Sequence, residues 1–300
     1  MHGWLVIDKP AGPGSTQIVS AVKRALREGG YSKAKVGHGG TLDPLASGVL
    51  PVALGEATKL CGRMLDADKV YQFTIRFGEA TATLDCEGEV VARSDVRPSW
   101  RAVEAVLERF TGLIRQVPPA YSALKVDGRR AYDRARGGEE VELEARSVTI
   151  HSLTLHEAAL HAPSDEAAEV TLSARVSKGT YIRSLARDIA LALGTVGHVT
   201  MLRRVKAGPF AIESSFSLDK VGEFAQARQL EELLLPLTAG LDDIPALSVT
   251  PDQARALRQG RKLAGIAAKP GLHLATDAFV PVALVEIQGA ELRVVRGFNL

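Results

Sequence analysis

The sequence is poor in cysteine and has no long hydrophobic run. Its 300 residues contain only two cysteines, too few for a disulfide framework or a cysteine-based zinc site and typical of a reducing cytoplasm. No stretch of about 18 apolar residues occurs, so we expect no membrane-spanning helix. The apolar run at residues 4–7 is followed at once by Asp8, which is unlike a secretory signal peptide. We therefore expect a cytoplasmic protein with no membrane partner.

A strong excess of one charge is also missing. The chain has 37 Lys and Arg against 35 Asp and Glu, a net charge of +2. Binding to nucleic acid must therefore be argued from local basic clusters, because the overall balance does not indicate it. With 46% hydrophobic and 24% charged residues, the composition is that of an ordinary globular protein, long enough for one large domain and a smaller one.

The most informative stretch is GHGGTLDPLASG, at residues 37–48. Three glycines precede Asp43 and Pro44 follows it. Glycine lets a ligand approach the main chain closely, and proline disfavours helical geometry in the residue before it. We expect Asp43 on a sharply turned loop that presents its carboxylate outward. No cysteine cluster or second acid adjoins it, so no metal site is indicated. A plain Asp in a turn is the alternative.

Together with the run GEATK at residues 55–59, this stretch resembles the GHxGTLDPxAxGxL signature of the TruB-type pseudouridine synthases, which make pseudouridine at position 55 of tRNA. The resemblance recurs in three further blocks and covers most of residues 3–210. It implies that Asp43 is the catalytic nucleophile and that His38 lies beside the target base. Gly39 stands where the family often has Thr.

Residues 71–77 predict a half-buried strand, because apolar side chains alternate with polar ones from Tyr71 to Phe77. On this pattern alone Tyr71 is a core aromatic. The segment also resembles the family's DKxYxxxxxxG motif, which implies that Tyr71 stacks on the target base. A tyrosine at the start of the strand can do both, and its hydroxyl can act as a proton acceptor.

Residues 116–137 form a basic segment with two interleaved tyrosines. Its candidate RNA-binding cations are Lys125, Arg129, Arg130, Arg134 and Arg136. Cations neutralise phosphates and aromatic rings stack on bases, so the composition suits RNA. A solvated helix face is the alternative. The segment resembles the family's QxPPxYSAxKxxGxxxYxxAR motif, which implies an insertion, at about residues 116–146, that clamps the tRNA arm.

The stretch SKGTYIRSL at residues 177–185 opens a predicted helix, with Thr180 as its N-cap and Gly194 as its stop. A cation in the first turn is unfavourable to the helix dipole, so Arg183 needs a partner, of which a carboxylate is the obvious one. An exposed arginine without a role is the alternative. The resemblance implies that Arg183 pairs with Asp43 and that Tyr181 contacts the substrate. By the same resemblance Leu202 packs on the base; otherwise it is a core leucine.

The C-terminal part of the sequence shows a Leu-rich segment, then a linker, then a short helix and strands. Residues 217–240 are Leu-rich and predicted helical, and a linker is expected at 241–247. Thr250 and Pro251 start a short helix, followed by strands at residues 279–287 and 292–295. This order resembles a PUA domain, a small β-barrel that binds RNA; a purely structural cap is the alternative.

The expected fold is α+β: a pseudouridine synthase fold with a mixed, largely antiparallel central sheet in residues 1–240, and a PUA-like domain in residues 247–300. The resemblance implies an isomerase that flips uridine 55 out of the tRNA T-loop and converts it to pseudouridine. Asp43 attacks C1′ or C6, Tyr71 and Arg183 complete the catalytic set, and no cofactor or metal takes part. The expected partner is the T-arm stem-loop of tRNA, bound by a monomer without an obligatory protein partner.

Two other interpretations stay open. One is a non-catalytic RNA-binding or chaperone protein that has kept the fold; the joint presence of Asp43, Tyr71 and Arg183 argues against it. The other is a dyskerin-type enzyme, which shares the motifs but works inside a guide-RNA particle. The insertion at 116–146 favours the stand-alone kind.

Overall fold

The computed structural model describes residues 1–122, 124–126, 128–139, 141–156 and 166–300. Its main feature is a nine-stranded sheet with the central order β1-β3-β12-β4-β11-β10-β7; β2 pairs with β3 and β13 with β12. The strands are β1 (Gly3–Lys9), β2 (Val36–His38), β3 (Ser47–Leu54), β4 (Lys69–Phe77), β7 (Gly112–Gln116), β10 (Arg146–Leu155), β11 (Glu169–Val176), β12 (Gly197–Ala207) and β13 (Phe210–Ala211). Only β3 and β12 pair in parallel among these described strands, so the predicted mixed, largely antiparallel sheet is confirmed.

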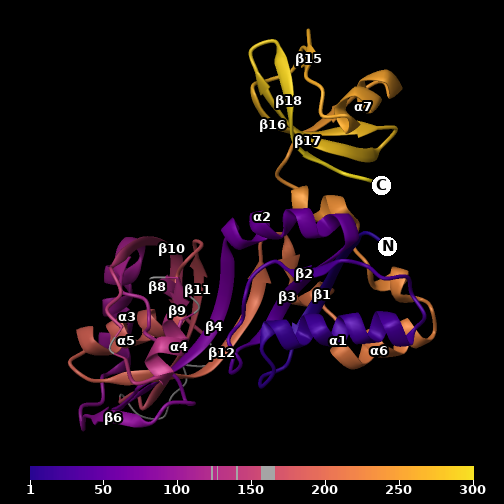
Figure 1. The fold of residues 1–300 in the computed structure, drawn as a ribbon. Helices are drawn as coiled ribbons and strands as arrows, with labels where there is room; N and C mark the ends of the chain where they lie inside the picture. Colours follow the sequence, from indigo (N-terminus) through magenta and orange to yellow (C-terminus); the bar gives the residue numbers. More distant parts are fainter. Residues whose placement is uncertain (123, 127, 140, 157–165) are drawn as a thin grey trace.

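Helices flank the sheet at its two ends (Figure 1). At one end α1 (Ser15–Glu28) packs against α6 (Leu218–Gln226). At the other, α5 (Ile182–Ala192) packs against β12 and contacts α3 (Trp100–Leu107). Shorter described elements are η1 (Gly55–Leu60), α2 (Cys61–Asp66), β5 (Glu79–Thr81), β6 (Val90–Arg93), η2 (Glu108–Phe110), β8 (Lys125–Val126), β9 (Arg129–Arg130), α4 (Ala131–Arg136), η4 (Ile212–Ser214), η5 (Leu230–Leu233) and η6 (Leu237–Leu241).

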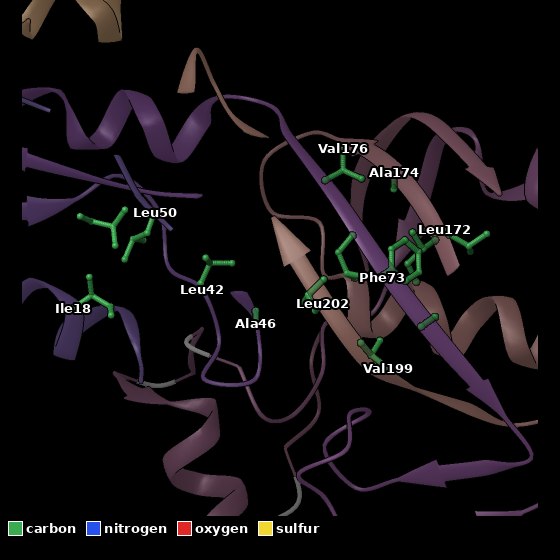
Figure 2. Packing of buried hydrophobic residues seen from close by; sticks show 14 of the residues in the cluster. Ile18, Leu42, Ala46, Leu50, Phe73, Leu172, Ala174, Val176, Val199 and Leu202 are labelled. Carbon is green, nitrogen blue, oxygen red and sulfur yellow. The ribbon is translucent and has the colours of Figure 1, made fainter. Parts of the chain in front are cut away.

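One core cluster joins the middle of the sheet to the loop between β2 and β3. Figure 2 shows Phe73, Leu172 and Leu202 around β4, with Leu42 and Ala46 of the loop beside them. Leu42 and Ala46 are buried. Because apolar side chains on both sides of Asp43 are held in the core, the loop has a fixed place beside β4 and β12.

Residues from Ala246 onward form a separate five-stranded sheet, which Figure 1 shows beyond α2. Its order is β14-β16-β17-β18-β15. The elements are β14 (Ala246–Ser248), α7 (Pro251–Arg258), β15 (Leu263–Ala264), β16 (Gly271–Asp277), β17 (Val280–Gln288) and β18 (Glu291–Gly297). Thr250 caps α7 through a capping box, as its sequence predicts. Phe298 packs in one apolar cluster with Trp4 and Leu60, which joins this sheet to the rest of the molecule.

Ser15 is the first residue of α1, and its hydroxyl binds the main chain of Leu42. Residues 146–155 form one strand, β10, whose pairing with β11 contains a bulge. One prediction in this part of the fold was wrong. The predicted helix at 217–240 ends at Gln226, and Arg228 with a positive φ of 57° separates it from two short 3₁₀ turns. None of the described helices is long and apolar enough to cross a membrane.

Candidate active site

A cavity of about 300 Å³ lies where the β2–β3 loop, the start of β4 and the turn before α5 meet. Its lining includes five of the predicted site residues: Asp43, Tyr71, Tyr181, Arg183 and Leu202. These come from sequence positions up to 159 residues apart, so the fold alone brings them together. The lining among the described residues does not include His38 or the candidate RNA-binding cations of the basic segment.

The loop that carries Asp43 is fixed by its main chain. Ser15 Oγ accepts a hydrogen bond from the Leu42 amide at 2.8 Å and donates to the Leu42 carbonyl at 3.0 Å. The Ala46 amide donates to the Asp43 carbonyl at 3.1 Å, and the Gly12 amide to the Pro44 carbonyl at 2.8 Å. The Asp43 side chain itself keeps 37% of its surface exposed. A rigid loop therefore presents a reachable carboxylate at the cavity.

Arg183 joins two carboxylates. Its Nη2 lies 2.8 Å from Asp43 Oδ2 and its Nη1 lies 3.2 Å from Asp85 Oδ2. The guanidinium also donates to the carbonyls of Thr83 and Tyr121, each at 2.9 Å. Arg183 is 5% exposed, and a buried charge of this kind needs such partners. They also compensate its unfavourable place in the first turn of α5.

Asp85 was not predicted from the sequence. It is 2% exposed and accepts hydrogen bonds from the Thr83 hydroxyl and, at 3.0 Å, from the Glu87 amide. Many of the residues around it in the sequence are small and polar, which by itself indicates only a turn. Its contact with Arg183, 98 residues later, is visible only in three dimensions.

Tyr181 occupies the N-cap position of α5, so the prediction of Thr180 as the cap was wrong. The Thr180 hydroxyl instead donates to the Ser177 carbonyl at 3.0 Å. The Tyr181 amide donates to Gln116 Oε1 at 2.8 Å, and the Arg146 guanidinium lies 4.8 Å from the centre of the Tyr181 ring. The ring is therefore held against the cavity wall by a cation–π contact.

Tyr71 and Leu202 come from neighbouring strands. In the β4–β12 pair, Tyr71 stands opposite Arg204 and Leu202 opposite Phe73. Leu202 is 6% exposed and lies both in the core and in the cavity lining. Tyr71 is half-buried and packs against the same core. Both residues therefore contact the core and also line the cavity.

His38 lies at the end of β2, and its Nδ1 accepts a hydrogen bond from the Gly40 amide at 3.4 Å. Burial, with a further contribution from the charge of Arg204, lowers the pKa of His38 below its usual value. A neutral imidazole at neutral pH follows. Through this contact His38 is joined to the glycine turn that leads to Asp43.

The basic segment folds as a small hairpin, β8 and β9, followed by α4. Arg129 and Arg134 both bind the carboxylate of Glu139, at 2.9 and 2.8 Å. The Arg136 guanidinium lies 5.7 Å from the centre of the Tyr132 ring. The side chains of Lys125 and Arg130 lie outside the described residues. Two of the candidate phosphate contacts are therefore shared with an acid.

No group of three or more His, Cys, Asp or Glu side chains is placed to hold a metal ion in the part of the chain that the structure describes. The described lining of the cavity offers one partly exposed carboxylate, the buried guanidinium groups of Arg183 and Arg204, the buried Lys69, two tyrosines and an apolar wall.

Comparison with known proteins gives consistent results. Residues 27–182 match the family model described as TruB family pseudouridylate synthase, N-terminal domain, and residues 183–242 match that of the tRNA pseudouridylate synthase B C-terminal domain. The chain is 64% identical to the tRNA pseudouridine synthase B of Novosphingobium aromaticivorans, over all of this chain and 98% of that protein. It is 60% identical to the protein of the same name from Zymomonas mobilis, over 100% and 96% of the two chains.

Solved structures show the same fold. A chain in the crystal structure of a Cbf5-Nop10-Gar1 complex superposes with a TM-score of 0.74 at 26% identity. The superposition covers 99% of this chain and 85% of that chain.

Proposed function

Because this chain belongs to the TruB family of pseudouridylate synthases, we propose that it isomerises uridine 55 in the T-loop of tRNA to pseudouridine, with Asp43 as the nucleophile. The observation that carries the assignment of Asp43 is its ion pair with Arg183 at the cavity wall. This ion pair is the only side-chain hydrogen bond or ion pair of Asp43 in the described part of the chain. It engages Oδ2, which leaves Oδ1 for attack on the substrate.

The reaction conserves every atom of the nucleotide. The Asp43 carboxylate adds to C1′ or C6, and the N1–C1′ bond breaks with its electron pair left on the base. The base then turns, C5 bonds to C1′, and the bond to Asp43 breaks with its electron pair returned to the carboxylate. The proton on C5 is lost while N1 gains one. Arg183 orients the carboxylate, and Tyr71 stacks on the base and accepts a proton late in the sequence. Tyr181 and Leu202 bound the base, and His38 lies beside it.

The base must leave its loop before it can enter the cavity, so the enzyme must hold RNA on both sides of it. We assign residues 1–240 to a catalytic domain with an RNA-clamping insertion at 116–146. That insertion includes residues 123, 127 and 140, which lie outside the described residues. Residues 247–300 are assigned to a PUA-like RNA-binding domain. The separate five-stranded sheet supports this division.

We also propose that the protein acts as a monomer on the T-arm stem-loop, without a guide RNA or protein partner. The sequence identities support this choice. The chain is 64% identical to a protein named tRNA pseudouridine synthase B, but 26% identical to the chain from the Cbf5-Nop10-Gar1 complex.

The test is mass mapping of pseudouridine in an unmodified T-arm hairpin incubated with the purified protein alone. We expect modification at the uridine equivalent to position 55. Asp43→Asn keeps the side-chain shape but removes its charge, so it should bind the hairpin and give no product. If this variant forms more than a trace of product, Asp43 is not the nucleophile. If the wild-type protein is inactive alone and becomes active with guide RNA, the dyskerin-type alternative is favoured.

A further inference from the structure

Arg204 is a buried cation whose partners are all main-chain carbonyls. It is 1% exposed; its Nε donates to the Val49 carbonyl at 2.7 Å, its Nη1 to Thr41 at 3.2 Å and its Nη2 to Gly40 at 3.1 Å. No carboxylate forms an ion pair with it in the described ranges of the chain. Arginine is almost never fully buried without pairing, so this placement needs an explanation.

A second buried cation holds the other end of the same loop. Lys9 is fully buried, and its Nζ donates to the carbonyls of Pro10 and Pro13, each at 2.8 Å, and of Pro44 at 3.3 Å. Like Arg204, it forms no ion pair among the described residues. Burial lowers the pKa of Lys9 to about 8, against the opposing effect of the Asp43 charge. On the N-terminal side of Asp43, the carbonyls of Gly40 and Thr41 are bound by Arg204. On its C-terminal side, the carbonyl of Pro44 is bound by Lys9.

The sequence of the loop fits this arrangement. Gly40 has a φ of +141°, which strongly favours glycine, and a Cβ at this position would lie 3.6 Å from Arg204 Nη1. The loop therefore turns so that two successive carbonyls meet one guanidinium. A planar fork with several donors can bind them and Val49 at once; a lysine ammonium, as a point charge on a flexible stem, cannot reproduce that geometry.

We propose that Arg204 is a positioning residue for the reaction: with Lys9 it clamps the loop at residues 40–44 and so fixes the Asp43 carboxylate against the target base. The proposal rests on the proposed function of Asp43. Its consequence is that Arg204 acts on the rate of the chemical step and little on RNA affinity, because misplacement of a reacting group by about 1 Å lowers a rate by about 100-fold.

The test compares Arg204→Lys with Arg203→Lys. Arg204→Lys keeps the buried positive charge but loses the planar guanidinium that binds several carbonyls at once. The second is the matched control on the adjacent residue, whose guanidinium contacts Asp8 and Ser47 and not the loop carbonyls at residues 40, 41 and 44. At saturating T-arm hairpin, we expect the single-turnover rate of Arg204→Lys to fall at least about tenfold while its Kd stays within about twofold. Arg203→Lys should stay near wild type.

Hydrogen exchange supplies a readout that does not depend on activity. The Leu42 amide donates to Ser15 Oγ and the Ala46 amide donates to the Asp43 carbonyl, so both hydrogen bonds depend on the position of the loop. Both amides should lose protection in Arg204→Lys but not in Arg203→Lys. If Arg204→Lys fails to fold, Lys9→Gln removes the cation from the Pro44 end of the loop, together with its bonds to Pro10 and Pro13, and should show the same two effects.

A folded Arg204→Lys with a wild-type rate and unchanged protection overturns the proposal. So does a variant with a raised Kd and a normal rate, which would make Arg204 a binding residue. A wild-type protein that leaves the hairpin unmodified contradicts the proposed function instead; the exchange data then still show whether the clamp exists.

Discussion

At the scale of single residues, Gly39 shows how a departure from a family pattern is explained by its neighbours. A Cβ on Gly39 would lie 2.6 Å from Met64 Cβ, 3.0 Å from Met64 Cγ and 3.6 Å from Trp4 Cζ3. Met64 and Trp4 are both buried, so neither has room to move away. The space that a threonine side chain would take is already filled in this protein.

We therefore predict that Gly39→Thr destabilises the protein by about 1–3 kcal/mol through overpacking. Met64→Gly removes both of these Met64 atoms, so Gly39→Thr should cost less stability in the Met64→Gly background than in the wild-type chain. The measurement is a double-mutant cycle by denaturant unfolding. If the two changes add independently, the contact between positions 39 and 64 is not what excludes threonine.

Asp85 gives the second residue-scale prediction. Asp85→Asn keeps the shape of the side chain but takes one of two negative charges from the buried Arg183. We expect a loss of about 1–3 kcal/mol in stability and a slower single-turnover rate, because Arg183 then aims Asp43 less firmly. Glu87→Gln, two residues away and exposed, is the control. Equal rates for the two variants would mean that Asp43 and Arg183 suffice by themselves.

At the scale of elements, two arginines of the basic segment, Arg129 and Arg134, share the carboxylate of Glu139. Hydrogen bonds from Arg134 and Arg129 lower the pKa of the Glu139 carboxyl. The contacts are thus present at neutral pH and are lost as the pH falls through this lowered pKa. RNA phosphates have to compete with Glu139 for both arginines.

We predict that Glu139→Gln tightens hairpin binding and steepens its dependence on salt, because the acid that competes with phosphate for Arg129 and Arg134 loses its charge. Glu142→Gln removes the same charge from the same insertion, three residues further along the chain, and is the control. Titration of hairpin binding at several salt concentrations measures both. If both variants gain the same hairpin affinity, the effect comes from the change in overall charge and not from the loss of the Glu139 contacts.

Elements with a clear period were predictable from the sequence, and those without one were not. The alternation from Tyr71 to Phe77 correctly predicted a strand, which is part of β4, and Thr250 with Pro251 correctly predicted the start of α7. Strands β14, β15 and β16 were missed, because two are very short and none shows strict alternation. The helix at 217–240 was overextended because a Leu-rich run does not reveal a residue such as Arg228 with positive φ. In the site, Asp43 and Arg183 came from the family motifs, whereas Asp85 and Arg204 depend on contacts distant in sequence.

At the scale of the whole molecule, the C-terminal sheet is joined to the segment that follows β3. Lys59 Nζ donates to the Gly297 carbonyl at 2.8 Å, and the Asn299 amide donates to Glu56 Oε2 at 2.8 Å. Phe298, between these contacts, is 1% exposed and packs with Trp4 and Leu60. The junction thus fixes the C-terminal sheet relative to β3, which leads back to the Asp43 loop.

The last prediction tests this junction with Phe298→Ala, which removes its central aromatic side chain and lowers stability by about 3–5 kcal/mol. If the C-terminal sheet supplies affinity and little chemistry, the Kd for whole tRNA should rise, while the saturated single-turnover rate changes far less. Val295→Ala is the control, since Val295 lies on β18, three residues before Phe298, with half its surface exposed. Binding is measured for whole tRNA and for the T-arm hairpin below the unfolding temperature of the variant. Unchanged Kd values for both RNAs would favour a structural cap, because loosening the junction would then have cost no RNA contact.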